Sequence, residues 1–236
     1  MSAPRPLGAL ARGIVAGAVV AVTSAGGASV ASAQPHLEIS GSGGWWGGYD
    51  LGSRRPTISG PQTPTGSPVA IFDSDVTLRS GPAAEVRVGW RVWRGVYAEA
   101  TGGYASSTLE ARVTNDLEDA PDLTVSSSLM QVTIEGGAVV ELPALGAGRH
   151  LVPFVSGGAG HLRQVHEDRV LVETGTTLYA GGGVKWRVAD VKPKGFVQRL
   201  FVRGDLRFVS RTGGTGVDDE RRHYITVSAG VGIRLF

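Results

Sequence analysis

The chain of 236 residues contains no cysteine, which excludes a disulfide framework, a thiolate metal site and a lipid-modified cysteine anchor. Aromatic residues are scarce at 7%, whereas 36 residues are glycine. Because glycine costs about 1 kcal/mol relative to alanine inside a helix, this composition disfavours a helical bundle. Beyond residue 33, no segment resembles the roughly 20-residue apolar run of a transmembrane helix. The fold must therefore rest on strands.

Residues 34–236 also carry no net charge. The chain has 23 Lys and Arg against 21 Asp and Glu, and Arg5 and Arg12 lie within the first 33 residues, which contain no acid. The remaining 203 residues therefore carry 21 charges of each sign. This balance removes the electrostatic support that a nucleic-acid partner requires, so we expect none.

The first 33 residues have the order of a secretory signal peptide. Arg5 and Arg12 precede an uncharged apolar stretch, residues 13–22, and small residues then lead to Ala31-Ser32-Ala33. The apolar stretch is too short for a permanent helical anchor. We predict a signal peptide over residues 1–33, cleavage after Ala33, and one exported domain over residues 34–236.

Alternation of apolar and polar residues with period two dominates this domain. The runs have the roughly ten-residue length that a tilted strand needs to span a bilayer: residues 36–49, 84–93, 96–106, 129–142, 151–163, 177–188, 200–210 and 224–236. Tyr49 falls on the apolar side of the first run and Leu235 on that of the last. In residues 151–163 both sides are apolar or glycine, so their facing stays open.

The connections between the runs alternate in length. Long connections, such as residues 50–83 and 107–128, are rich in Pro, Gly, Ser, Thr and Asp, whereas others, such as that around Arg94, are short. Short inner turns and longer outer loops are typical of outer-membrane barrels. The pattern predicts an all-β, eight-stranded antiparallel up-and-down transmembrane β-barrel. Residues 69–79 either extend the second strand or form a separate hairpin.

Charge decides which face of each strand looks inward. An Arg facing lipid near the midplane costs about 2 to 4 kcal/mol, so the charged face must line the lumen. Acids and bases nearly balance there, which predicts ion pairs across a plugged lumen, formed by Glu38, Glu85, Arg87, Glu99, Glu135, Arg203, Asp205 and Arg207. On the apolar face, four aromatic residues near strand ends form either an interfacial girdle or ordinary strand packing: Trp45, Trp90, Trp186 and Phe208.

Four segments together resemble the small outer-membrane β-barrel proteins that include the OmpA transmembrane domain, OmpX and OmpW. They are PFVSGGAG (153–160), YAGGGVKWRV (179–188), FVRGDLRF (201–208) and GVGIRLF (230–236). The resemblance implies an outer-membrane location, contact with outer-membrane lipid and lipopolysaccharide, and insertion by the outer-membrane assembly machinery.

That machinery reads the last strand, so Arg234, Leu235 and Phe236 are the expected assembly signal. Phe236 alternates with Arg234 rather than with Leu235, which requires either a bulge or a residue beyond the usual end of the strand. Arg221 and Arg222 are candidates for contact with lipopolysaccharide phosphates. Because the sequence stops at Phe236, we expect no peptidoglycan-binding domain after the barrel.

Catalytic and metal-binding patterns are weak. Some related barrels are lipid A deacylases, whose pattern places a Ser two residues after a His, but the residues two positions after the five histidines are Glu38, Val152, Arg163, Asp168 and Ile225. We therefore predict no enzyme, no catalytic residue and no cofactor. Two groups have metal-ligand residue types, but we interpret them as solvated loops and predict no metal: His166-Glu167-Asp168, and Asp218-Asp219-Glu220 with His223.

Four functions remain in competition. We favour a structural or surface-interaction role through the outer loops, whose ligand the sequence leaves unknown. The alternatives are a narrow conduit for small or hydrophobic solutes, a lipid-modifying enzyme, and a soluble periplasmic barrel. The last is suggested by Gly44-Trp45-Trp46, which matches the G-x-W of lipocalins.

Overall fold

A computed structural model describes residues 36–58, 69–115, 121–146, 150–166, 171–190, 197–215 and 220–235. The predicted leader lies outside these residues, so the cleavage site stays a prediction. The structure assigns one short 3₁₀ turn, Pro143–Leu145. In the described ranges, no helix has the length and apolar character to cross a membrane.

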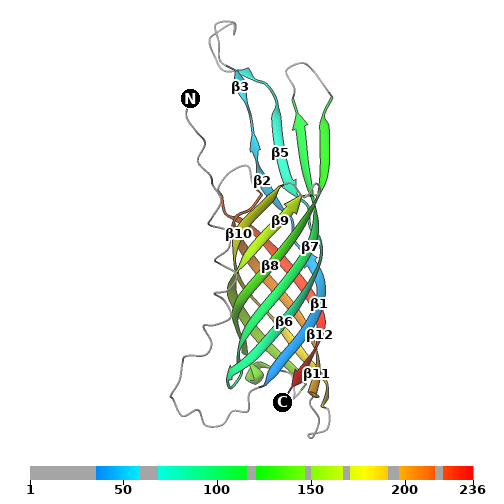
Figure 1. Ribbon diagram of the computed structural model, residues 1–236, viewed down its shortest axis with the longest axis vertical. Helices are drawn as coiled ribbons and strands as arrows, with labels where there is room; N and C mark the ends of the chain where they lie inside the picture. The colour runs from blue at the N-terminus through cyan, green and yellow to red at the C-terminus, as the bar shows by residue number, and fades with distance from the viewer. Residues whose placement is uncertain are drawn as a thin grey trace, which may run out of the picture. The chain divides into compact units, whose positions relative to one another are not determined.

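Eight antiparallel strands close into a ring (Figure 1). Each pairs with the next along the chain, and the last pairs with the first over residues 226–235 and 37–46. This confirms the predicted eight-stranded antiparallel up-and-down barrel. Its strands are β1 (Leu37–Trp46), β6 (Gly81–Trp93), β7 (Val96–Thr114), β8 (Leu123–Glu141), β9 (Leu151–His166), β10 (Val172–Asp190), β11 (Val197–Gly213) and β12 (Arg222–Leu235).

Several strands continue beyond the barrel, at the end opposite to the start of β1 and the end of β12 (Figure 1). Strand β2 (Tyr49–Arg54) follows β1, and β5 (Asp73–Leu78) precedes β6 and pairs with both β2 and the upper part of β7. Residues 108–113 of β7 pair with residues 123–128 of β8. We call β2, β5, residues 109–114 of β7 and residues 123–127 of β8 the strand extension.

The strand extension corrects the expectation of loops over residues 50–83 and 107–128. Much of these segments is paired strand: Leu51 of β2 and Leu78 of β5 are buried on one face, whereas residues 123–126 of β8 are exposed on both faces. For residues 69–79, each of the two predicted alternatives holds for one part of the segment. Strand β5 extends the second barrel strand, whereas β4 (Val69–Ala70) pairs separately with β3 (Thr57–Ile58).

The two faces of the barrel wall differ sharply in polarity. On the outside, Val86, Leu206 and Val231 are 60%, 56% and 61% exposed, whereas the inward Arg87 and Arg203 are each 2% exposed. An apolar band around the whole barrel far exceeds the exposed patches of water-soluble proteins. This surface argues against a soluble periplasmic barrel.

Two predicted facings are wrong. Tyr49 is buried rather than outward, because β1 ends at Trp46 and β2 begins after the break at Gly47 and Gly48. Leu235 is 4% exposed although it follows the inward Arg234. The strand alternation is lost there, where the adjacent β11 also shifts register between Val197 and Arg199. Phe236 lies outside the described residues.

Glycines make room for large side chains inside the barrel. A Cβ on Gly183 would lie 1.9 Å from the carbonyl oxygen of Gly204 and 2.7 Å from Cζ of Phe154. A Cβ on Gly232 would lie 2.3 Å from Cζ of Phe201. Glycine at these two positions therefore lets the Phe154 and Phe201 rings approach the backbone of the neighbouring strand.

Candidate functional site in the barrel lumen

Charged side chains from four strands meet in the middle of the lumen. We call them the central network, and they are Glu85 and Arg87 from β6, Glu99 from β7, Glu135 from β8, and Arg203, Asp205 and Arg207 from β11. They comprise seven of the eight residues predicted for the lumen network. Residues two apart on a strand share a face, which explains why 203, 205 and 207 all point inward.

Arg203 lies at the centre of this network. Its Nη1 donates to Glu99, and its Nη2 lies 3.1 Å from Oε1 of the same carboxylate. Its Nε and Nη2 each lie 2.9 Å from an oxygen of Asp205. The guanidinium thus makes two bidentate contacts, the strongest arrangement for an Arg and a carboxylate.

Arg87 and Arg207 extend the network to the surrounding wall. Arg87 pairs with Glu85, reaches Asp205 at 3.4 Å, and donates to the hydroxyls of Ser42 at 3.1 Å and Ser228 at 3.0 Å. Arg207 lies 3.3 Å from Glu135 and 3.5 Å from Glu99. Ion pairs therefore cross the lumen between β6, β7, β8 and β11.

Glu38, the eighth predicted residue, belongs to a separate group that we call the lower cluster: Glu38, Glu141, Lys185 and Arg234. The Lys185 Nζ lies 2.6 Å from Glu38 and 2.9 Å from Glu141. Arg234 contacts Glu38 and lies 3.3 Å from Glu141. Arg234, predicted as part of the assembly signal, thus has its side chain in an ion-pair cluster inside the barrel.

An aromatic layer separates the two charged groups, formed by Tyr97, Phe154 and Phe201. The Phe154 ring centroid lies 4.6 Å from Cζ of Arg203 on one side and 5.9 Å from Nζ of Lys185 on the other. Lys185 Nζ also lies 4.6 Å from the Tyr97 centroid. These cation–π contacts stabilise cations at the boundary of a water-poor layer.

An apolar cap closes the other side of the central network. Its buried members are Tyr49, Leu51, Leu78, Leu129, Tyr179, Val209 and Tyr224. Arg211 donates to the Tyr49 hydroxyl, and its Cζ lies 4.6 Å from the Tyr49 ring centroid. A polar chain runs alongside, in which Gln164 donates to Gln131 at 2.9 Å and Gln131 to Ser107 at 3.0 Å.

Sequence reasoning missed Arg211, Gln131 and Gln164. Arg211 shares its strand face with Arg203 and Arg207, so continuing the alternation of β11 would have placed it inward. Gln164 lies one residue beyond the predicted run 151–163, in a segment read as a connection, whereas β9 continues to His166. Its partner Gln131 lies between the apolar Met130 and Val132, so alternation gives its facing, but its contacts depend on how the strands pair.

The four aromatic residues predicted for the girdle all lie on the outer surface. Trp45, Trp90, Trp186 and Phe208 are 54%, 50%, 58% and 52% exposed. Trp45 lies at the end of β1 that is next to the strand extension. Trp90 and Trp186 both lie toward the other end of the barrel, near the C-terminal ends of β6 and β10. Their role at the membrane interface stays a prediction.

The loop residues considered for metal binding or catalysis are only partly described. Glu167, Asp168, Asp218 and Asp219 lie outside the described residues, and within the rest no group of three or more His, Asp or Glu gathers as metal ligands. His166 Nε2 lies 3.3 Å from Thr215 Oγ1 and 3.7 Å from Glu173 Oε2. Both neighbours meet the same nitrogen, so the imidazole does not bridge them as a proton relay would.

No family model and no curated protein sequence matches the chain. Among solved structures, it is similar to Neisserial surface protein A (NspA), with 10% identity, a TM-score of 0.46, and coverage of 85% of this chain and 96% of that one. It is also similar to OprG from Pseudomonas aeruginosa, with 9% identity, a TM-score of 0.46, and coverage of 85% and 95%. The attachment invasion locus protein Ail of Yersinia pestis, in complex with the heparin analogue sucrose octasulfate, matches at 12% identity and a TM-score of 0.40, with coverage of 84% and 99%.

The geometry of this chain itself indicates its location. An antiparallel barrel with an apolar outer band and a charged interior is the architecture of transmembrane barrels of the outer membrane. The chain is therefore an integral outer-membrane β-barrel protein. The short turn between β6 and β7 lies at the end where β1 begins and β12 ends, and short turns are typical of the periplasmic side.

Proposed function

We propose that this protein is a plugged, non-catalytic outer-membrane barrel that presents its strand extension to protein partners outside the cell. The observation that carries the proposal is the exposed edge of β8 within that extension. Contact with lipopolysaccharide, for which Arg221 and Arg222 stay candidates, and recognition of Arg234, Leu235 and Phe236 by the assembly machinery belong to the same proposal. Arg222 also hydrogen-bonds the carbonyl of Leu51 at 2.9 Å.

The plug is supported by three successive layers. The interior of an eight-stranded barrel is just wide enough for side chains to fill. Here the lower cluster, the aromatic layer and the central network follow one another, and the apolar cap lies beyond them. A passing ion would have to displace buried ion pairs and then cross an apolar layer. The lumen therefore suits stability rather than transport.

We expect the purified protein to give no single-channel current steps in a planar lipid bilayer. An open porin in the same bilayers is the positive control, and heat-modifiable gel migration of protein recovered from the lipid verifies that the barrel is folded. Discrete current steps from the folded protein would contradict the plugged lumen and favour the conduit.

The edge of β8 is open over Leu123–Ser127. These residues pair with β7 on one side, whereas β9 pairs with β8 only from Leu129 onward, so among the described strands none covers their other edge. Leu123 and Val125 are 57% and 53% exposed. An exposed edge with apolar side chains accepts an additional strand from a partner, whose backbone supplies the hydrogen bonds.

Two exposed ion pairs join residues of the extension to residues beside it. Arg79 lies 2.9 Å from Glu110, Arg112 lies 3.0 Å from Asp122, and both pairs are exposed. The hydrogen bond from Arg79 holds the pKa of Glu110 below its ordinary value. Exposed pairs of this kind contribute little to stability, so the extension depends mainly on the pairing of its strands.

A double substitution, Leu123→Lys with Val125→Lys, tests the edge. Charged edge residues oppose the addition of another strand, so we expect roughly tenfold weaker attachment, equivalent to about 1.4 kcal/mol. The measurement is attachment of cells displaying the chain to a panel of immobilised extracellular proteins. Thr108→Lys, on the exposed face of an interior strand, is the matched control and should attach like wild type. Attachment no greater than that of cells lacking the chain, or unchanged in the double variant, would reject the surface role.

A further inference from the structure

The outward face of β9 changes from apolar to basic toward the strand extension. From Leu151 to Ala159 the outward residues are uncharged, and the next two on this face are His161 and Arg163. Both are exposed, whereas Leu162 and Gln164, which alternate with them, are buried inside the barrel. The two basic side chains therefore point away from the lumen, toward the surroundings of the barrel.

Two threonines face outward beside them on β10. His161 is opposite Thr176 and Arg163 is opposite Thr174 in the register of the two strands, and both threonines are exposed. Paired residues share a face of the sheet, with their Cβ atoms about 5 Å apart. The four residues therefore form one polar surface, which we call the rim patch: His161, Arg163, Thr174 and Thr176.

The rim patch lies at the outer edge of the membrane. The end of β9 is next to the strand extension, where His166 pairs with Leu129 (Figure 1). A strand rises about 3.3 Å per residue and tilts by about 40° in such barrels, so His161 and Arg163 lie roughly 25 and 30 Å above Leu151 along the barrel axis. The apolar band of outer-membrane barrels is about 25 Å tall. The two side chains thus reach the level of the lipid headgroups.

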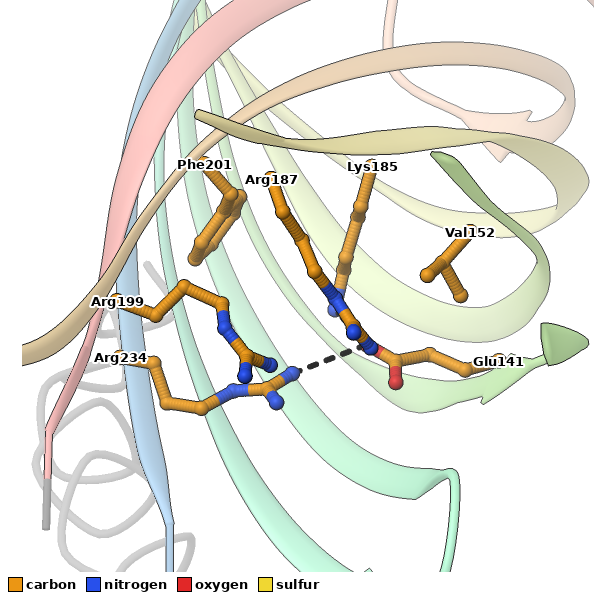
Figure 2. Close-up of a pocket in the computed structure, with 7 residues that line it drawn as sticks. All are labelled: Glu141, Val152, Lys185, Arg187, Arg199, Phe201 and Arg234. Carbon is orange, nitrogen blue, oxygen red and sulfur yellow. Dashed lines mark hydrogen bonds and ion pairs between the residues drawn. The ribbon is translucent and has the colours of Figure 1, made fainter. Parts of the chain in front are cut away.

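Arg163 and His161 also differ from the cations inside the barrel. Those cations meet carboxylates, as Figure 2 shows for Arg234 and Glu141, 3.3 Å apart. Among the described residues, neither Arg163 nor His161 takes part in an ion pair or a side-chain hydrogen bond. The connection between β9 and β10, residues 167–170, lies outside the described residues and includes Glu167, Asp168 and Arg169. The rim patch is therefore distinguished by its facing and its height, and not by a net charge.

A lipid phosphate matches the donors of the rim patch. Near the interface an outward Arg costs only about 0 to 1 kcal/mol, so Arg163 is tolerated even without a ligand. Its guanidinium fork fits two phosphate oxygens, and His161 lies two residues away on the same face. The threonine hydroxyls supply further donors. Since the patch opens toward the membrane rather than the lumen, a phosphate that binds there belongs to a lipid.

We propose that the rim patch binds a phosphate of an outer-leaflet glycolipid, with Arg163 as its principal donor. A phosphate carried on the same sugar as the acyl chains lies close to the hydrocarbon boundary, which is the height of His161 and Arg163. The site gives the lipopolysaccharide contact of the proposed function a second location, on β9, and rests on that function for the outward direction of the strand extension. It does not depend on a partner for the β8 edge.

The test is native mass spectrometry of the full folded chain in a glucoside detergent. The chain is titrated with lipid A that carries its phosphates, with the same lipid A after removal of the phosphates, and with phosphatidylglycerol. We expect saturable binding of phosphorylated lipid A, weakened about tenfold by Arg163→Gln and less by Arg163→Lys, which keeps the charge but lacks the fork. Arg94→Gln, which removes an exposed arginine from the turn between β6 and β7, is the matched control and should bind like wild type.

The arms separate the possible outcomes. Equal binding of phosphorylated and phosphate-free lipid A overturns the proposal, as does binding that Arg163→Gln leaves unchanged. Phosphatidylglycerol that binds as tightly as lipid A and depends equally on Arg163 replaces the glycolipid by a general lipid phosphate. Weakening by Arg221→Gln but not by Arg163→Gln removes this site and leaves the lipopolysaccharide contact of the proposed function intact. Heat-modifiable migration verifies folding, and should a variant not fold, the wild-type comparison of the two lipid A forms decides.

Discussion

Replacement of Arg203 by methionine is expected to lower the free energy of unfolding by about 3 to 5 kcal/mol, the usual cost of removing one partner from a buried ion pair. Arg203 makes bidentate contacts with both Glu99 and Asp205, and the side chains of all three are at most 4% exposed. Arg207 lies 3.5 Å from Glu99 and 3.7 Å from Asp205. It already serves Glu135, so it compensates only in part.

Urea unfolding of the barrel in lipid vesicles, followed by tryptophan fluorescence, measures this loss. The double variant Arg203→Met with Glu99→Met should recover part of the stability, because one buried carboxylate is then no longer left without its cation. Glu110→Gln, which disrupts the exposed pair with Arg79, is the control and should change stability little. A loss below about 1 kcal/mol for Arg203→Met would place the network in a water-filled lumen and would contradict the plug.

Replacement of Leu206 by arginine is expected to cost about 2 to 4 kcal/mol in a bilayer, the range for an Arg on the lipid face near the midplane. Leu206 is 56% exposed and lies within the outward apolar series of β11 that runs from Leu200 to Phe208. Its neighbours Asp205 and Arg207 are inside the barrel and buried. One step along the strand therefore separates a position where charge is paired from one where it meets hydrocarbon.

Thr212→Arg is the matched control for this prediction. Thr212 lies on the same face of the same strand and is also exposed, but it is beyond the apolar series. Near the interface the cost of Arg falls to about 0 to 1 kcal/mol. Unfolding in vesicles compares the two variants, and equal stability of Leu206→Arg and Thr212→Arg would contradict a bilayer around this part of the barrel.

Alternation was sufficient to find the inward residues in the barrel strands. Glu99, Arg203 and Asp205 were placed in the lumen from their strand positions alone, because successive side chains of a strand must point to opposite faces. The same rule placed Trp45 and Phe208 outside. It failed for Tyr49 and Leu235, where the glycine break after β1 and the irregular end of the sheet change the facing.

The sequence by itself thus determined the strand number, the facing of every barrel strand except β9, and most of the charges that must be buried. These depend on local periodicity and on the cost of charge in lipid. Only the tertiary structure decided which charges meet. Glu38 pairs with Lys185 across 147 sequence positions, and Arg203 pairs with Glu99 across 104. Such partners depend on the stagger with which the sheet closes. The strand extension was also visible only in the tertiary structure. Its strands have the amino-acid composition of loops, and only their pairing with neighbouring strands identifies them as strands.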